Sequence, residues 1–348
     1  MPQKNVVVNK NRNQMSKSSI KFSLIIPVYN RPQEVEELLE SLTLQTKKHF
    51  EVIIVEDGSV ADCKYVVDKY IDRLDISYFY KENSGPGQSR NYGAQHASGE
   101  YFIVLDSDCI IPPNYIDSLF CEIEAGEVDA FGGPDKASNH FTNIQKAINY
   151  AMTSFFTTGG IRGGKKKLDK FYPRSFNMGI KKDVYLDLGG FSNMRFGEDI
   201  DFSIRLYKNN YVVKLFPSAY VYHKRRTDWR KFFKQVFNSG IARVNLYKIY
   251  PESLKLVYLL PAAFVLFTLF CMVSAIFCLY AILPVVLWAF LIFVDSSTKN
   301  KNLYIGLLSV IASFVQLTGY GMGLLSASWK RLVLKRDKYS AFERNFYE

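Results

Sequence analysis

The sequence lacks the cysteine patterns of disulfide-bonded and zinc-binding proteins. Its five cysteines are odd in number, scattered and without C-x-x-C spacing, which argues against a disulfide framework and against a zinc site. We therefore expect the chain to work in a reducing compartment. No aromatic-basic RNA-binding motif occurs either, so we expect no nucleic acid partner despite a net charge of +11.

An apolar export signal is also missing from the first twenty residues. Residues 1–20 form a polar, basic N-terminal segment without an apolar h-region, and we expect the segment that follows to remain in the cytosol. Other basic residues cluster in 224–243 and 330–338, where they flank very apolar sequence. This placement favours a membrane surface as the partner of the positive charge.

Four apolar runs between residues 22 and 108 each end in polar or acidic residues. Stretches long enough for a helix separate them, and this rhythm predicts an α/β fold with a mostly parallel sheet. After Pro32, apolar residues recur at helical spacing, which predicts a helix. Because parallel strands bind ligands beyond their carboxyl ends, we expect one crevice at the strand ends. The residues that follow those ends are Pro27, Tyr29, Asn30, Glu56, Asp57, Glu82, Asn83, Asp106 and Asp108.

The fourth run, Tyr101 to Cys109, points most directly to chemistry. Asp106 and Asp108 follow a stretch that reads as a fully buried strand. Carboxylate oxygens suit Mg²⁺ or Mn²⁺, and these ions are commonly shared with substrate phosphates. The pair therefore predicts a metal and diphosphate site. A bare D-x-D pair also fits two solvated acids that open a loop, and the convergence of four strand ends is what favours the site.

Two later stretches carry further candidates. Gly85 opens a helix predicted over 88–97, with Arg90 and Asn91 in its first turn; glycines at a helix N-terminus suit phosphate, although an ordinary loop-to-helix junction looks the same. A strand predicted over 211–222 ends at a histidine. That residue, His223, is either a metal ligand beside basic residues or a structural histidine.

Two more stretches are open to a functional or a structural interpretation. The basic tract 163–167 is either a mobile lid or a solvated loop. Glu198, Asp199 and Asp201 begin an apolar-periodic stretch, and acids at that position also stabilise a helix N-terminus electrostatically.

Taken in order, these motifs resemble glycosyltransferase family 2. The resemblance covers residues 22–226 and rests on S-L-I-I-P-V-Y-N, V-E-D-G-S, G-P-G-Q-S-R-N, L-D-S-D, G-G-F and G-E-D-I-D-F. It implies a GT-A fold, Rossmann-like with a mostly parallel sheet, over residues 21–226. It also implies an inverting enzyme that uses a nucleotide sugar and a divalent metal.

The resemblance also implies roles for single residues. Asp57 would accept a hydrogen bond from the nucleoside base, and Tyr29 would lie against that base. In the E-D pair, Asp199 would be the general base beside Glu198. The metal ligands would be Asp106 and Asp108. His223, a candidate from its position at the end of the predicted strand, would be the third. The residues assigned to the nucleotide sugar are Pro27, Tyr29, Asn30, Arg31, Glu56, Asp57, Gly85, Arg90, Asn91 and Asp106.

Some family features differ in this chain. Glu56 stands where an Asp is common, and Cys109 where an acid or a small residue is common. No Q-x-x-R-W follows Asp199, which puts processive synthesis in doubt.

The last third of the chain predicts membrane association. Residues 227–250 form an amphipathic pattern, aromatic on one side and cationic on the other, typical of an interfacial helix or of a helix packed on the catalytic domain. Residues 254–294 form an apolar run with a single charge. Because this run is too long for one membrane span, it predicts a transmembrane hairpin of two helices.

A third apolar segment, residues 303–327, is interrupted by Gln316 and by Gly319, Gly321 and Gly323, and it is either a span or a re-entrant segment. The basic C-terminal tail, residues 328–348, would then lie on the side of the catalytic domain, because positive charge beside an apolar segment favours the cytosol.

We interpret the chain as a multi-pass inner-membrane glycosyltransferase with a cytosolic catalytic domain. It would transfer a single sugar from a nucleotide sugar, UDP-linked, to a polyprenyl-linked or glycolipid acceptor in surface-glycan assembly. A nucleotidyltransferase is an alternative and would release pyrophosphate. A non-catalytic protein that binds nucleotide sugars is the other, and it would show no turnover.

Overall fold

A seven-stranded sheet organises the N-terminal two-thirds of the chain in the computed structural model, which describes residues 20–136, 141–158 and 171–336. The strand order is β3-β2-β1-β4-β8-β6-β9. β1 pairs in parallel with β2 and with β4, and β2 pairs in parallel with β3. The strands are β1 Phe22–Val28, β2 Phe50–Asp57, β3 Ile76–Lys81, β4 Tyr101–Leu105, β6 Ala130–Gly132, β8 Asn177–Lys181 and β9 Val213–Leu215. The predicted α/β class and the shared carboxyl edge of the first four strands are confirmed.

Helices cover both faces of this sheet. Alternate residues of β1 enter two separate cores: Leu24 and Ile26 pack with α1, α2 and α4, whereas Ile25 packs with α3, α7 and α8. α1 buries the apolar side predicted from its spacing, Val35, Leu38, Leu39 and Leu42. The helices are α1 Pro32–Thr43, α2 Lys64–Val67, α3 Pro86–Gln95, α4 Tyr115–Glu124, α7 Lys182–Asp187 and α8 Glu198–Lys208.

A second, three-stranded sheet lies beside the end of β4. It consists of β5 Cys109–Ile110, β10 Val221–His223 and β7 Asp135–Lys136. The single strand predicted over 211–222 is therefore wrong, because β9 and β10 belong to different sheets. The chain turns between them, where the Ala219 amide donates to the Phe216 carbonyl next to Pro217.

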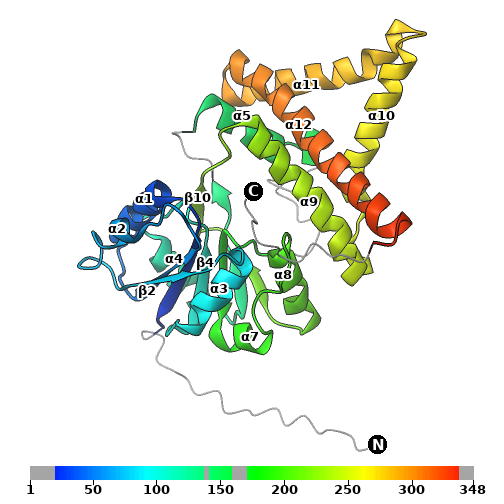
Figure 1. Ribbon diagram of the computed structural model, residues 1–348. Coiled ribbons are helices and arrows are strands. Elements are labelled where there is room, and N and C mark those ends of the chain that lie inside the picture. Colours follow the sequence, from blue (N-terminus) through cyan, green and yellow to red (C-terminus); the bar gives the residue numbers. More distant parts are fainter. Residues whose placement is uncertain (1–19, 137–140, 159–170, 337–348) are drawn as a thin grey trace, which may run out of the picture.

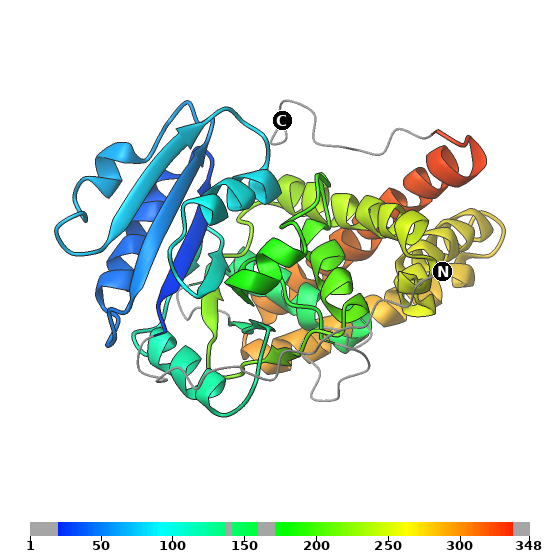
Figure 2. The same cartoon turned by 90° about the horizontal axis from the view of Figure 1, so that it is seen from below.

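The C-terminal helices lie at the end of the domain away from β2 and β3 (Figures 1 and 2). Phe232 and Val236 of α9 are buried against Ala147 of α5 and Ala312 of α12. The apolar side predicted to face a membrane interface is thus covered by protein along this stretch. The C-terminal helices are α9 Trp229–Ile249, α10 Leu260–Ser274, α11 Leu283–Asn300 and α12 Leu303–Ser328, and they pack on α5 Asn143–Thr153 and α6 Phe155–Thr158 from the middle of the chain.

Among the residues that the structure describes, three helical stretches are long and apolar enough to cross a membrane: Leu256–Ser274, Leu279–Asn300 and Leu303–Val333. α12 is one continuous helix, so the break that a re-entrant segment would need at Gln316 and the glycines is not there. The glycines serve close packing instead. A Cβ at Gly323 would lie 2.1 Å from the Phe237 carbonyl oxygen of α9, and one at Gly321 would lie 2.4 Å from the Pro261 carbonyl oxygen of α10.

Candidate active site

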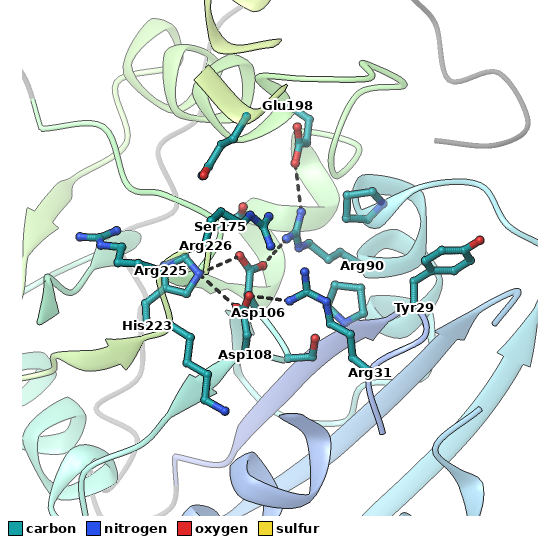
Figure 3. Close-up of a pocket in the computed structure, with 15 residues that line it drawn as sticks. Tyr29, Arg31, Arg90, Asp106, Asp108, Ser175, Glu198, His223, Arg225 and Arg226 are labelled. Atoms are coloured by element: carbon teal, nitrogen blue, oxygen red, sulfur yellow. Dashed lines mark hydrogen bonds and ion pairs between the residues drawn. The ribbon is translucent and has the colours of Figure 1, made fainter. Parts of the chain in front are cut away.

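A polar cavity of about 240 Å³ opens at the carboxyl ends of β1 and β4. Figure 3 shows Asp106 and Asp108 at its centre, with Arg31, Arg90 and His223 directed toward them. The lining residues come from strand ends, from α3 and α8, and from the start of α9. They are Pro27, Tyr29, Arg31, Pro86, Arg90, Asp106, Ser107, Asp108, Ser175, Glu198, His223, Lys224, Arg225, Arg226 and Gln235.

Asp108 lies between two basic side chains. Its Oδ2 is 2.5 Å from Arg31 Nη1, and its Oδ1 is 3.1 Å from His223 Nε2. The register of the small sheet creates the second contact, because His223 pairs with Cys109 directly beside the acid. The ring of Phe176 stacks on the imidazole at 5.1 Å, which fixes its orientation.

Charge pairing shifts both partners away from their ordinary acidity. Burial alone would raise the pKa of Asp108, but the charge and hydrogen bond of His223 and the charge of Arg31 lower it well below its usual range. Burial alone would lower the pKa of His223, but the charge and hydrogen bond of Asp108 have the larger effect and raise that pKa. Asp108 is therefore ionised at neutral pH and available as a ligand.

The chemistry of these residues fits a hard divalent cation. Asp108, Cys109 and His223 each place one ligand atom within 4.8 Å of the others. Burial and the neighbouring carboxylates raise the pKa of the Cys109 thiol well above its usual value, and a protonated sulfur does not suit Mg²⁺ or Mn²⁺. Asp106 Oδ2 lies 3.9 Å from His223 Nε2. Asp108 Oδ1 is buried, and His223 Nε2 lies 3.1 Å from it.

Arg90 links the acids of β4 to those of α8. Its side chain is buried, with Nη2 at 2.8 Å from Asp106 Oδ1 and Nη1 at 3.1 Å from Glu198 Oε1. Arg226 also lines the cavity and contributes to the lowered pKa of Asp108. The basic side chains that line the cavity therefore outnumber the acidic ones, and this excess of positive charge suits an anionic ligand.

Glu198 and Asp199 begin α8 but have different surroundings. Glu198 lines the cavity, and burial together with the charge of Asp199 raises its pKa to about 7. Asp199 Oδ2 accepts a 2.6 Å hydrogen bond from Arg174 Nε. Burial opposes ionisation of Asp199, but Arg174 lowers its pKa. At neutral pH, Asp199 is thus the carboxylate of the pair that stays charged.

The predicted nucleotide-binding residues divide into two groups. Pro27, Tyr29, Arg31, Arg90 and Asp106 line the cavity. The others lie outside its lining and shape the loops around it; they are Asn30, Glu56, Asp57, Gly85 and Asn91.

Two of these outer residues fix the loop that follows β2. Asn30 Oδ1 accepts from the amides of Val60 and Ala61. Glu56 is fully buried and accepts from the Ser59 hydroxyl and the Cys63 amide. Their carboxylate and amide oxygens are occupied within the protein.

Asp57 fixes the loop that opens α3. It is fully buried and accepts from the amides of Ser84 and Gly85, each at 2.8 Å, and from Lys81 Nζ at 2.7 Å. Gly85 has φ +90°, a conformation that side chains disfavour. The acid thus holds the glycine turn that places Arg90 in the cavity.

Asn91 joins α3 to the loop that precedes α8. Its Nδ2 donates to the Phe191 carbonyl at 2.8 Å, and its Oδ1 accepts from the Phe191 amide at 2.8 Å and from the Tyr185 hydroxyl at 2.6 Å. We expect Asn91→Ala to lower the free energy of unfolding by about 1–3 kcal/mol, because these partners lose their bonds. Thermal unfolding of purified protein measures the effect. The exposed Gln95→Ala on the same helix should change nothing, and equal melting temperatures for the two variants would contradict the role of Asn91.

Sequence reasoning missed several cavity residues. Ser175 and the nearby Arg174 follow an irregular stretch with no periodicity to place them, and Gln235 is one polar residue in an amphipathic helix. No sequence signal identifies these three. The basic tract 163–167, considered as a lid, lies outside the described residues.

Comparison with known proteins identifies the catalytic part. Residues 23–189 match the family model described as Glycosyl transferase family 2. A protein of Haemophilus influenzae, named as an uncharacterized glycosyltransferase, is 32% identical over 193 residues, 53% of this chain and 61% of the relative. A Rickettsia felis protein with the same description is 38% identical over 137 residues, 39% of this chain and 22% of the relative. The match thus spans less than two-thirds of either relative.

A solved structure extends the likeness beyond the family match. A mannosyltransferase from Pyrobaculum calidifontis, solved in complex with GDP-Man and Mn²⁺, is similar over 85% of this chain and 87% of its own, with a TM-score of 0.59 and 15% identity. This likeness concerns the fold, and it confirms the GT-A architecture.

Proposed function

Because residues 23–189 form a glycosyltransferase family 2 domain, we propose that the protein transfers a single sugar from a nucleotide sugar to a hydroxyl of a membrane-associated acceptor. One observation carries this proposal. Asp106, Asp108 and His223 meet Arg31, Arg90 and Arg226 in a single cavity at the strand ends. A hard cation and several cationic side chains together suit a diphosphate.

A divalent metal is the expected cofactor. Asp106, Asp108 and His223 would hold Mg²⁺ or Mn²⁺, and the bound ion would offset the negative charge that develops on the departing diphosphate. The structurally similar mannosyltransferase contains Mn²⁺, which supports testing that ion first.

This chain's own residues would supply the remaining functions. Arg90 and Arg226 would stabilise the diphosphate leaving group electrostatically. Asp199 would take the proton of the acceptor hydroxyl, because Arg174 keeps it ionised; such a base contributes about 10² to 10⁴ in rate. Glu198 would position Arg90 through their 3.1 Å ion pair. One base without a nucleophile fits a single displacement with inversion.

The place of α9 supports a membrane-associated acceptor. Gln235 lines the cavity, and the next residue, Val236, is buried beneath α12. The cavity therefore adjoins the apolar C-terminal helices. A polyprenyl-linked or glycolipid hydroxyl at a cytosolic membrane surface would reach the acids from this side, in the assembly of a surface glycan.

A donor screen tests the proposal. Purified full-length protein with Mn²⁺ would be incubated with single nucleotide sugars, UDP-linked sugars first and GDP-Man next, and thermal stabilisation and donor hydrolysis recorded. We expect one donor class to raise the melting temperature in the presence of Mn²⁺ and to be hydrolysed slowly. No stabilisation and no hydrolysis with any donor would favour a non-catalytic protein.

A further inference from the structure

The most exposed apolar surface of the described chain lies where α10 meets α11. Residues 275–282 connect the two helices and contain no charged side chain. Phe277 is 89% exposed, and Ile276, Leu279 and Tyr280 are each more than three-quarters exposed. Exposed apolar residues continue from this tip along both helices, including Phe270, Met272, Leu287 and Phe290.

The backbone of this tip suits an apolar environment. The amides of Ala275, Ile276, Phe277 and Cys278 donate to carbonyls of the last turn of α10, and a 3-10 turn, Leu279–Ile282, follows. Hydrocarbon offers no partners to backbone groups, so structures inside it must satisfy those groups internally. A turn exposed to water on the opposite side of the membrane could hydrogen-bond to water, and it would need neither these internal backbone hydrogen bonds nor an uncharged sequence.

The helices α10 and α11 form a hairpin, and both of its arms pack against α12. A Cβ at Gly321 would clash with Pro261 at the start of α10, and one at Gly306 would clash with Ser297 at the end of α11. In Figure 1 the helices α10, α11 and α12 accordingly form three sides of a triangle, with the tip away from α12.

α12 is attached to the catalytic part at both of its ends. Near its start, Leu308 and Ala312 pack on Ala147 and Ile148 of α5. Just beyond its end, Arg331 Nη1 donates to Asn245 Oδ1 of α9 at 2.6 Å, and Leu246, the next residue of α9, packs on Ile204 of α8. A helix that touches one domain at both ends lies along it. It does not leave that domain to cross a bilayer.

We propose that the C-terminal region is a monotopic wedge: the α10–α11 hairpin enters one leaflet and returns to the same side, while α12 lies along the membrane surface. Both arms are long enough to enter the bilayer. Because α12 contacts the domain at both of its ends, a hairpin whose two arms pack on α12 returns to the side from which it entered. This topology differs from the multi-pass arrangement that the sequence predicts.

The charges at the base of the wedge identify lipid as its partner. Lys299 lies in the last turn of α11 and Lys301 just after it, and Lys330, Lys335 and Arg336 follow α12; these side chains are exposed. The tip has no charge. An uncharged tip above a cationic base complements acyl chains beneath anionic headgroups, whereas a second copy of the chain would bring a base of the same sign.

Thiol labelling tests the topology. The full chain would carry Cys121→Ala, which leaves native Cys278 at the tip as the exposed reporter. In the other variants Cys278→Ala is added, and each carries one reporter in its place: Lys301→Cys, Lys335→Cys or Val60→Cys. Val60 lies in the catalytic part and is 94% exposed, so it marks the side of that domain. Membrane-impermeant reagent would be applied to intact and to permeabilised cells.

We expect Lys301→Cys and Lys335→Cys to be labelled under the same conditions as Val60→Cys. Native Cys278 should be labelled only after the membrane is dissolved and the protein denatured. Labelling of Lys335→Cys from the side opposite to Val60→Cys would mean that α12 crosses the bilayer, and labelling of Cys278 from that side would mean that the hairpin does. Either result overturns the proposal.

Vesicle flotation tests the partner. Protein diluted from detergent onto phosphatidylglycerol–phosphatidylethanolamine vesicles should float with them, and Phe277→Asp should lower the ratio of bound to free protein by at least about ten-fold, because an acid in hydrocarbon is costly. Val60→Asp is the matched control and should bind normally. A wild-type chain that stays off the vesicles as a soluble dimer, which Phe277→Asp converts to a monomer, would assign the surface to a second copy instead.

Discussion

Asp108→Ala is expected to abolish metal-dependent binding of the nucleotide sugar. The variant removes the acid that faces both Arg31 and His223, so Asp106 and His223 alone would have to hold the cation and the diphosphate. Loss of an outer-shell partner of a metal ligand typically costs 10- to 100-fold in affinity. Loss of a direct ligand should therefore cost at least about 100-fold. Calorimetric titration of the donor with and without Mn²⁺ measures this difference.

The exposed Asp72→Ala is the matched control for that titration. It removes a carboxylate of the same domain outside the cavity lining, and its donor affinity should equal that of the wild type. Circular dichroism should show that Asp108→Ala keeps its fold, because the acid lies beyond the end of β4 and outside both sheet cores. A folded Asp108→Ala protein with undiminished Mn²⁺-dependent affinity would remove Asp108 from the site.

Asp199→Asn is expected to keep donor affinity and to lower the transfer rate by at least about 10², the lower limit for loss of a general base. The amide preserves the shape of the side chain but cannot accept the proton. Single-turnover transfer at saturating donor and metal separates this effect from binding. Glu198→Gln is the paired variant, and it should impair transfer less because Glu198 acts through Arg90.

The pH dependence of the same rate separates the two acids. Arg174 lowers the pKa of Asp199, so its base form persists as pH falls, and between pH 8 and pH 6 the rate should fall by no more than the Glu198→Gln change lowers it. The pKa of Glu198 is raised to about 7, so its charged form is lost in this interval. A rate that falls about ten-fold per pH unit below 7, together with greater damage from Glu198→Gln than from Asp199→Asn, would transfer the role of base to Glu198.

The sequence was sufficient to predict the four parallel strands of the sheet and the cavity at their carboxyl ends. Apolar runs followed by acids are local signals, and parallel pairing of β1, β2, β3 and β4 brings their ends together without further information. The helix after Pro32 was predictable for the same reason, because its buried residues follow a regular spacing.

The surroundings of each acid were not predictable, because they depend on contacts between distant segments. Arg174 reaches Asp199 from an irregular stretch 25 residues earlier. Asp57 and Asn91, both predicted to bind the nucleotide sugar, hold loops through partners 24 to 100 residues away. A motif predicts that a residue lies near the site, but it does not predict which groups donate hydrogen bonds to its side-chain oxygens.

The glycines of α12 show the same limit for the membrane region. From the sequence alone, glycines in an apolar segment indicate a broken helix as readily as close packing between two helices. Gly240 of α9 and Gly323 of α12 each face the backbone of the opposite helix, and that contact is visible only in the folded chain. The consequence for topology is large, because a packed helix can lie along the domain.

The identity of the released product tests the central claim most directly. Full-length protein, its stabilising donor, Mn²⁺ and a membrane extract as the source of acceptor would be incubated, and the nucleotide products separated by chromatography. The proposed transfer releases one nucleoside diphosphate for each sugar that enters the lipid fraction, and removal of Mn²⁺ or the Asp108→Ala change stops both. Release of pyrophosphate, or sugar transfer that persists undiminished in Asp108→Ala, would contradict the assignment of this cavity as a metal-dependent glycosyltransferase site.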